Sequence, residues 1–149
     1  MKARVLFLCT GNSCRSQMAE GWLRHLAGDR FEVFSAGTKP AGVNPTAVAA
    51  MREAGVDISA QESKNVATYL GQHFGYIVTV CDNAKEACPI FPGPAQRIHW
   101  SFDDPASASG SEQQRFEVFR RVRDEIRGRI EEWIRASAEI PHPLASREG

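Results

Sequence analysis

An eight-residue polar loop, Cys9-Thr-Gly-Asn-Ser-Cys-Arg-Ser16, constrains this chain more than any other feature. It follows the apolar run Arg4-Val-Leu-Phe-Leu8, and apolar side chains at helical spacing begin directly after it. A short apolar run that stops at Gly and Asn is typical of a buried strand. The sequence therefore predicts a strand, a tight loop and a helix in immediate succession.

The residue types in this loop suit a tetrahedral oxyanion. Gly11 and small polar residues let the backbone curl so that its N–H groups point inward, and a helix N-terminus adds partial positive charge. Arg15 can close the ring with two parallel donors. Cys9 would lie at the bottom, where the same field lowers its pKa and Ser16 could donate to the sulfur. The predicted site is a nucleophile in an anion-binding loop of Thr10, Gly11, Asn12, Ser13, Cys14, Arg15 and Ser16. The alternative is a buried cysteine before a polar turn. For Cys14, the alternative to a part in the site is packing as a small apolar residue against the loop.

The rest of the chain alternates strand and helix patterns. Strands are predicted over Phe31–Ala36, Tyr76–Val80 and, more briefly, Arg97–Trp100, and helices over Pro45–Ala54 and from Ser111 onward. Alternating strands and helices favour an α/β domain with a parallel sheet and right-handed crossovers. The chain of 149 residues has the length of one domain. We expect a catalytic domain over residues 1–137 and a disordered tail over 138–149, with the charges of the last helix forming a solvated face.

Composition excludes several classes of protein. Lys and Arg total 18, and so do Asp and Glu, which argues against a broadly basic nucleic-acid binder. No apolar run approaches the ~20 residues of a membrane span, and the N-terminus lacks the pattern of a signal peptide. A cytoplasmic, reducing setting is therefore expected, in which the four cysteines serve catalysis, redox cycling or metal binding rather than structural disulfides.

Three motifs together resemble the low-molecular-weight protein tyrosine phosphatase superfamily. They are the loop Cys9–Ser16, Ser35-Ala-Gly-Thr38 after the second strand, and Asp103-Asp-Pro105. The resemblance runs over nearly all of residues 3–135 and is greater to the arsenate reductase branch, the kind usually recycled by thioredoxin. It implies a four-stranded parallel sheet flanked by helices, with flavodoxin-like winding. It also implies Cys9 as nucleophile, Arg15 as oxyanion clamp and Asp104 as the acid before proline.

Two further cysteines distinguish a reductase from a phosphatase. Phosphate and arsenate can share one loop, but a reductase must also dispose of two electrons, so a second thiolate has to attack the Cys9 sulfur. Cys81 follows the third predicted strand, whose end lies on the same rim as the loop. Cys88 lies about two helical turns further on, so it can pair with Cys81 only if the segment between them loops out. Such a pairing would carry the disulfide to the surface for reduction. Cys81 as a core residue and Cys88 as an incidental thiol remain the alternative.

The segment around Asp104 also favours a small inorganic substrate. A neutral carboxyl there would protonate the departing oxygen, and Pro105 fixes the turn that presents it. Asp103 is the competing candidate for this role. The tyrosine phosphatases of the superfamily commonly carry aromatic residues after Asp-Pro, whereas Ala106–Gly110 here are small and offer no platform for a phenyl ring.

No cofactor and no metal are expected. His99 is too isolated to complete a zinc site, and His25, His73 and His142 suit surface or packing positions. Several of the similar reductases are described as binding potassium beside the loop through Asn, Glu, Ser and Asp. Asn12, Glu20 and Ser35 match the first three, but Lys64 stands in place of the Asp. Its ammonium could replace the cation by linking Glu20 to the loop, or it could simply be solvated.

The leading hypothesis is a monomeric arsenate reductase that binds arsenate, with phosphate or sulfate as mimics, and is reduced by thioredoxin or glutaredoxin. A phosphotyrosine or small-molecule phosphatase is the second hypothesis, and it would not need Cys81 or Cys88. A non-enzymatic oxyanion or thiol-redox sensor is the third, and it would bind without turnover. Neither nucleic acid nor membrane is expected as a partner.

Overall fold

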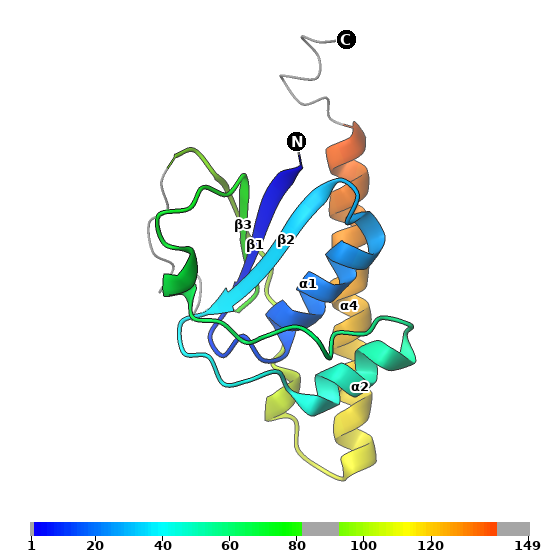
Figure 1. The fold of residues 1–149 in the computed structure, drawn as a ribbon. Helices are drawn as coiled ribbons and strands as arrows, with labels where there is room; N and C mark the ends of the chain where they lie inside the picture. The colour runs from blue at the N-terminus through cyan, green and yellow to red at the C-terminus, as the bar shows by residue number, and fades with distance from the viewer. Residues whose placement is uncertain (1, 82–92, 140–149) are drawn as a thin grey trace.

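A parallel sheet lies at the centre of the computed structural model, which describes residues 2–81 and 93–139. In these residues it has four strands in the order β2-β1-β3-β4. The strands are β1 (Ala3–Cys9), β2 (Phe31–Gly37), β3 (Tyr76–Thr79) and β4 (Gln96–His99). All neighbouring pairs are parallel, so their carboxyl ends share one edge of the sheet, at the lower end in Figure 1. The predicted α/β class and parallel sheet are confirmed.

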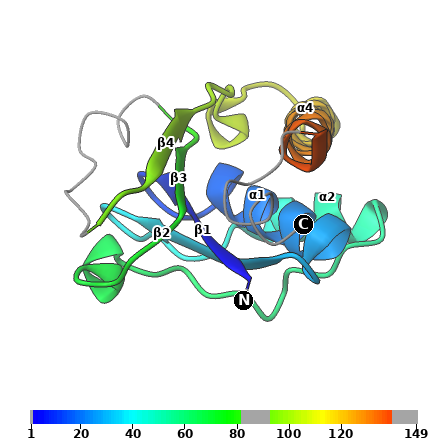
Figure 2. The same cartoon turned by 90° about the horizontal axis from the view of Figure 1, so that it is seen from above.

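The three α-helices of the described residues lie together on one face of the sheet (Figure 2). They are α1 (Arg15–Ala27), α2 (Pro45–Glu53) and α4 (Glu112–Glu139). Two short 3-10 helices, η1 (Val66–Tyr69) and η2 (Pro105–Ser107), were not predicted from the sequence. The η1 turn lies on the other face of the sheet, where Phe34, Tyr69 and Phe74 contact one another through their rings.

Local capping explains where α2 and α4 begin. The Asn44 side chain accepts the N–H groups of Thr46 and Ala47, and Pro45 occupies the first position of α2, as predicted. At the start of α4, the Ser111 hydroxyl accepts from Gln114 N, and the Gln114 side chain accepts from Ser111 N. The α4 helix continues to Glu139, past the domain boundary expected at 137, and residues 140–149 lie outside the described residues.

The core lies between the sheet and the helices. Val5, Leu6 and Phe7 of the central strand are fully buried, as are Val122, Ile126 and Ile130, which form an apolar stripe along α4. Burying such side chains contributes about 1.5–3 kcal/mol each relative to exposure. Trp22 of α1 reaches α4 and donates its indole N–H to the backbone carbonyl of Arg123, which satisfies the polar atom of a buried tryptophan. No helix among the described residues is long and apolar enough to cross a bilayer.

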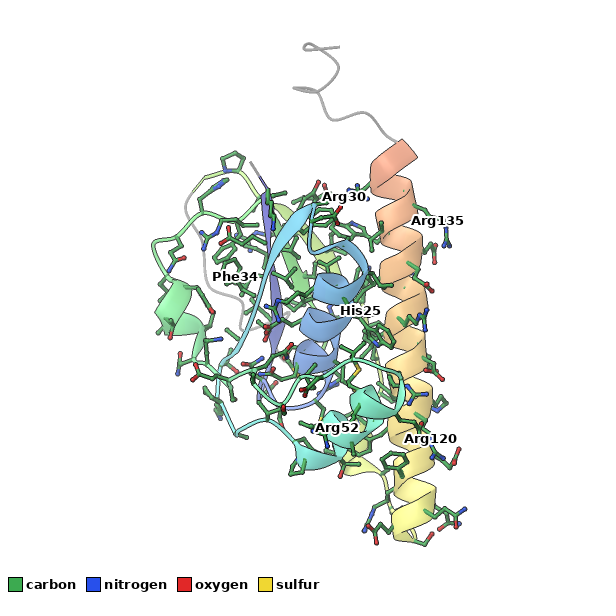
Figure 3. The ribbon with its side chains drawn as sticks, turned by 45° about the vertical axis from the view of Figure 1, so that its right-hand side comes forward. His25, Arg30, Phe34, Arg52, Arg120 and Arg135 are labelled. Atoms are coloured by element: carbon green, nitrogen blue, oxygen red, sulfur yellow. The ribbon has the colours of Figure 1, made fainter. Side chains whose placement is uncertain are left out.

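One charged residue of α4 does not lie on a solvated face, so the sequence-based prediction is wrong for Arg123. Its side chain is buried against α2, where it donates to Ala50 O at 2.9 Å and to Glu53 Oε1 at 2.8 Å. Arg120, which Figure 3 labels on α4, lies one turn earlier and donates to both oxygens of Glu53 at 2.8 and 3.2 Å through Nε. The periodicity of apolar residues could not reveal this, because Arg123 is buried through hydrogen bonds with α2.

The Glu53 cluster predicts a pH-dependent part of the stability. The hydrogen bonds of Arg120 and then of Arg123 lower the pKa of Glu53 to about 2. A carboxyl with a depressed folded-state pKa stabilises the fold above its unfolded pKa of about 4.3, and this contribution is lost as the pH falls toward 2. Glu53→Gln should therefore lower the melting temperature at pH 6 to 7, with a difference that shrinks below about pH 4.

Circular-dichroism melting curves of both proteins between pH 7 and pH 3 measure this difference. Glu131→Gln is the control, because it removes an exposed i,i+4 pair with Arg127 within α4 and should change the melting temperature little. A Glu53→Gln difference that stays constant over this pH range would contradict the linkage.

Candidate active site

The loop between β1 and α1 lies at the carboxyl edge of the sheet, where parallel α/β folds bind their ligands. Cys9 is the last residue of β1, and Cys14 is the N-cap of α1, whose first residue is Arg15. Cys9, Asn12, Cys14 and Ser16 are buried, while Thr10, Gly11, Ser13 and Arg15 are partly exposed. The structure thus brings together the predicted loop residues at the carboxyl edge of the sheet, in the segment that joins β1 to α1 (Figure 1).

The backbone carbonyls of this loop all have donors from neighbouring segments. The carbonyls of Cys9, Thr10, Gly11 and Ser13 accept the N–H groups of Thr38, Lys39, Ala41 and Asn44, that of Cys14 accepts Met18 N, and that of Asn12 accepts the Gln17 side chain. A carbonyl held by these bonds is kept from turning toward a bound anion. The loop N–H groups therefore remain for the concave side, as an oxyanion nest requires. One of them, Thr10 N–H, donates to the Cys9 sulfur.

Asn12 adopts an uncommon backbone conformation, with φ at 46°. Its side chain compensates, since Nδ2 donates to Ser16 Oγ at 2.8 Å and to Ser35 Oγ at 2.9 Å, and Oδ1 accepts Lys64 N at 2.8 Å. Asn tolerates the left-handed region better than most residues. These three hydrogen bonds of the Asn12 side chain hold the loop in its turn.

Gly37 leaves room for this turn from the neighbouring strand. A Cβ atom at Gly37 would lie 2.5 Å from Thr10 O and 2.8 Å from Asn12 N, both backbone atoms that cannot swing aside. Only a residue without a side chain fits this close approach. The Ser35–Thr38 motif thus serves the loop in two ways, through the Ser35 hydroxyl and through the space at Gly37.

Arg15 is positioned with one donor edge unused. Its Nη1 donates to Phe102 O at 3.1 Å, and Nη2 lies 3.9 Å from Asp104 Oδ2. Its buried Nε–H has no hydrogen-bond partner among the described residues. A buried polar group without a partner is costly unless a ligand satisfies it. The geometry therefore fits a guanidinium whose Nε–H is available to donate to a bound oxyanion.

Cys81 lies in hydrogen-bond contact with Cys9, as expected from the ends of two neighbouring parallel strands. Its Sγ is also 3.4 Å from the Thr10 hydroxyl. Cys9, Cys14 and Cys81 are free thiols. The structure thus places a second thiol beside the predicted nucleophile. Cys88 lies outside the described residues.

The pKa of Cys9 is raised, which differs from the sequence-based expectation. The hydrogen bond with the Cys81 thiol is the largest cause and burial the next, while Arg15 and the Thr10 N–H act in the opposite direction. The expectation included Arg15 and the loop amides but not a second thiol in contact. Two such thiols oppose each other's ionisation, so the pair readily holds only one negative charge.

Cys14 is suited to packing rather than to attack. Burial raises its pKa to about 11, with a smaller opposing effect from the Ser13 hydroxyl. Arg15 is the largest of the effects that favour a thiolate at Cys9, but it is the smallest of those that act on Cys14, so the charge of the loop favours attack by Cys9.

Asp104, and not Asp103, lies beside the loop arginine. Asp104 caps η2, since Oδ1 accepts Ala106 N at 3.0 Å and Oδ2 accepts the Ser107 hydroxyl at 3.1 Å. Asp103 is largely exposed and pairs with Arg121 of α4 at 3.1 Å. The structure thus distinguishes Asp104 from Asp103 as the carboxylate beside Arg15, which the residues alone could not do.

The cation beside Glu20 comes from Arg24 rather than from Lys64. Glu20 is buried; one of its oxygens accepts the Ser35 hydroxyl, and the other lies 2.6 Å from Arg24 Nη2. Lys64 contributes its backbone instead, through the bond to Asn12. With a guanidinium on the Glu20 carboxylate, these residues do not fit a bound potassium ion. The i,i+4 spacing of Glu20 and Arg24 was the sequence signal for this pair.

No group of three or more His, Cys, Asp or Glu side chains in residues 2–81 and 93–139 is placed to hold a metal ion. His99 instead shares a 2.7 Å contact between its Nδ1 and the Thr79 hydroxyl.

Comparison with known proteins agrees with this architecture. Residues 4–142 match the model of the low molecular weight phosphotyrosine protein phosphatase family, and the chain belongs to this family. Within it, an arsenate reductase of Halalkalibacterium halodurans is 53% identical over 129 residues, which cover 87% of this chain and 93% of the relative.

Solved structures place the chain in the same branch. A structure described as an arsenate reductase in the phosphate binding state matches with a TM-score of 0.72 and 35% identity, over 91% of this chain and 98% of the other. A thioredoxin-dependent arsenate reductase of Corynebacterium glutamicum matches with a TM-score of 0.68 and 30% identity, over 91% of this chain and 61% of the other.

Proposed function

We propose that this protein is an arsenate reductase that converts arsenate to arsenite through a relay of Cys9, Cys81 and Cys88. The observation that carries the proposal is the contact between Cys81 and Cys9 inside an anion-binding loop. A phosphatase of this fold needs one nucleophile in the loop, whereas a reductase needs a second thiol within reach of the first. The similarity to arsenate reductases supports the same conclusion.

In the first step, arsenate occupies the loop, held by the backbone N–H groups and by the unused Nε–H edge of Arg15. The Cys9 sulfur attacks arsenic, an S–As bond forms, and one oxygen leaves as water after accepting a proton. Asp104, beside Arg15, is the acid proposed for this proton. The loop supplies charge stabilisation that is already in place before the reaction begins.

In the second step, the Cys81 thiolate attacks the Cys9 sulfur. An S–S bond forms and the S–As bond breaks, so that its electron pair reduces As(V) to As(III) and arsenite departs. The Thr10 hydroxyl, 3.4 Å from Cys81, is placed to stabilise this thiolate. Cys88 then attacks the Cys81 sulfur, which forms a Cys81–Cys88 disulfide and frees Cys9.

A thioredoxin-type dithiol is proposed to reduce the Cys81–Cys88 disulfide, with glutaredoxin as the alternative reductant. A similar protein is named as thioredoxin-dependent, which supports the first choice. A reducing compartment such as the cytoplasm suits free thiols, and we propose a monomer because one chain contains all the residues of the relay.

The test is a coupled assay with purified protein, arsenate, NADPH and either the thioredoxin or the glutaredoxin system. Arsenate-dependent NADPH oxidation with one system, together with arsenite formation, would support the proposal. Hydrolysis of phenyl phosphate without any arsenate reduction would contradict it and favour a phosphatase.

Arg15→Lys tests the anion clamp. Lysine keeps the charge but loses the planar edge that can donate to two oxygens. We expect kcat/KM for arsenate to fall by about 10²–10³-fold, the usual cost of removing one oxyanion donor. Steady-state kinetics measure this, and wild-type values would mean that the backbone N–H groups alone hold the substrate.

A further inference from the structure

The carbonyl of Asn12 differs from the other carbonyls of the anion-binding loop. Four other loop carbonyls accept backbone N–H groups from the segment that follows β2, namely those of Cys9, Thr10, Gly11 and Ser13. The carbonyl of Cys14 accepts the N–H of Met18 in α1. Asn12 O instead accepts a side-chain amide, Gln17 Nε2, at 3.0 Å. The left-handed residue of the loop thus has its carbonyl held by a side chain in place of a backbone N–H.

Gln17 is fully buried and has a partner for each of its amide groups. Its Nε2 also donates to Glu62 O at 2.9 Å, and its Oε1 accepts Gln61 Nε2 at 2.7 Å. Both donors and the acceptor are therefore engaged. A Gln in the first turn of a helix often bonds back to the N-cap N–H, but here it reaches past Cys14 to a loop carbonyl.

Gln17 also joins the loop to the segment 61–64 that lies against it. Ser63 donates its hydroxyl to Gly11 O at 3.2 Å, and Lys64 donates its N–H to the Asn12 side chain at 2.8 Å. The Gln61 side-chain amide donates to both the backbone carbonyl and the side-chain oxygen of Gln17. The bonds from this segment reach the loop at Gly11 and Asn12, the middle of the anion-binding turn.

We infer that Gln17 is a positioning residue that sets the affinity of the loop for tetrahedral oxyanions by holding Asn12 in its left-handed conformation. Without the Gln17 amide, Asn12 O is free to rotate toward the concave side, where it would repel an anion. The same rotation of the peptide would turn the Ser13 N–H away. Gln17 touches no substrate atom and acts through Asn12.

This inference deepens the proposed function, since the site it concerns is the proposed arsenate site. Its test uses inorganic phosphate as the probe and needs no turnover. Gln17→Met keeps the length and helix propensity of the side chain but removes both donors and the acceptor. Gln72→Met is the matched control, because Gln72 contacts Arg4 at the opposite end of β1. Gln61→Met is the milder second variant, since it removes the bond to Gln17 Oε1 that orients the Gln17 amide toward Asn12 O but keeps the Gln17 donors.

The experiment is a phosphate titration of each full-length protein, followed through the backbone amide signals of residues 9–16 by NMR. For Gln17→Met we expect the Asn12 and Ser13 amide signals to move in the free protein. We also expect the phosphate Kd to rise by roughly 10- to 100-fold, because a displacement of about 1 Å at such a site can cost about 10²-fold. Gln61→Met should shift the same signals less, and Gln72→Met should leave both quantities unchanged.

The outcomes separate this inference from the proposed function. Folded Gln17→Met with the wild-type phosphate Kd would overturn the inference and leave the reductase proposal intact. If wild-type protein did not bind phosphate, the proposed function would be overturned, and unmoved Asn12 and Ser13 signals in Gln17→Met would overturn the inference as well. If Gln17→Met did not fold, Gln61→Met would decide, with unchanged signals and an unchanged Kd counting against the inference.

Discussion

Cys9→Ser should abolish arsenate reduction and any phosphate ester hydrolysis while leaving the fold intact. A serine hydroxyl is not ionised at neutral pH, and it cannot form the disulfide that receives the oxidising equivalents. Arsenite formation in the coupled assay should fall to the level without protein. The substitution removes a sulfur from a buried position but keeps the size of the side chain, so the far-ultraviolet circular dichroism should match that of the wild type.

Phosphate binding is the internal control for Cys9→Ser. The loop N–H groups, Arg15 and the Asn12 bonds do not depend on the sulfur, so the phosphate Kd should stay close to the wild-type value. Retained affinity without turnover assigns the loss to chemistry rather than to a collapsed loop. Measurable arsenate turnover by this variant would remove Cys9 from the mechanism.

The position of the site was predictable because it depends on local sequence and sheet topology. Strand β1 ends at Cys9 and α1 begins at Arg15, so the motif had to form a loop at the carboxyl edge. Parallel pairing of β1 with β3 then brought Cys81 to the same edge. These conclusions need only the order of the elements and the direction of the strands.

The pairing of charged and polar side chains was less predictable. Lys64 was a plausible partner for Glu20, but the α1 geometry gives that place to Arg24. From its residue type and its place in the helical pattern, Arg123 was expected at the surface. It is buried because its guanidinium donates to Ala50 O and Glu53 of α2. Which partner a long side chain selects depends on distances of a few ångströms between elements, and the periodicity of a sequence does not contain them.

The protonation of Cys9 and the role of Gln17 were difficult to predict for the same reason, because both depend on contacts between separate elements. Arg15 and a helix N-terminus in the sequence favour a thiolate, but the contact with Cys81 raises the Cys9 pKa. Gln17 follows the motif directly, yet its function depends on where Glu62 and Gln61 lie, segments distant along the chain. A residue that acts through a second residue leaves no pattern of its own in the sequence.

Cys81→Ser should separate reduction from hydrolysis. Cys9 could still attack arsenate, but no thiol in contact could then attack its sulfur, so neither arsenite nor a disulfide should form. Hydrolysis of a phenyl phosphate ester should survive, because that reaction needs only Cys9, Arg15 and Asp104. The expected result is therefore loss of one activity and retention of the other in the same protein, measured as arsenite release and phenol release.

Cys88→Ser should stop the relay one step later. A single turnover should release arsenite and leave a Cys9–Cys81 disulfide, because these two thiols are already in contact. Both cysteines are buried, so a reductant has poor access and multiple turnover should fail. Wild-type protein treated with arsenate should instead accumulate Cys81–Cys88, with Cys9 free for alkylation.

Mass spectrometry after alkylation and digestion distinguishes the unreacted state, the Cys9–Cys81 bond and the Cys81–Cys88 bond, each of which joins a different pair of peptides. The order in which they appear tests the direction of the relay, from the loop outward. If Cys88→Ser kept cycling with thioredoxin at the wild-type rate, the Cys88 step would be wrong. Cys14, on which the Arg15 charge has only a small effect, or an external thiol such as glutathione would then have to supply the missing nucleophile.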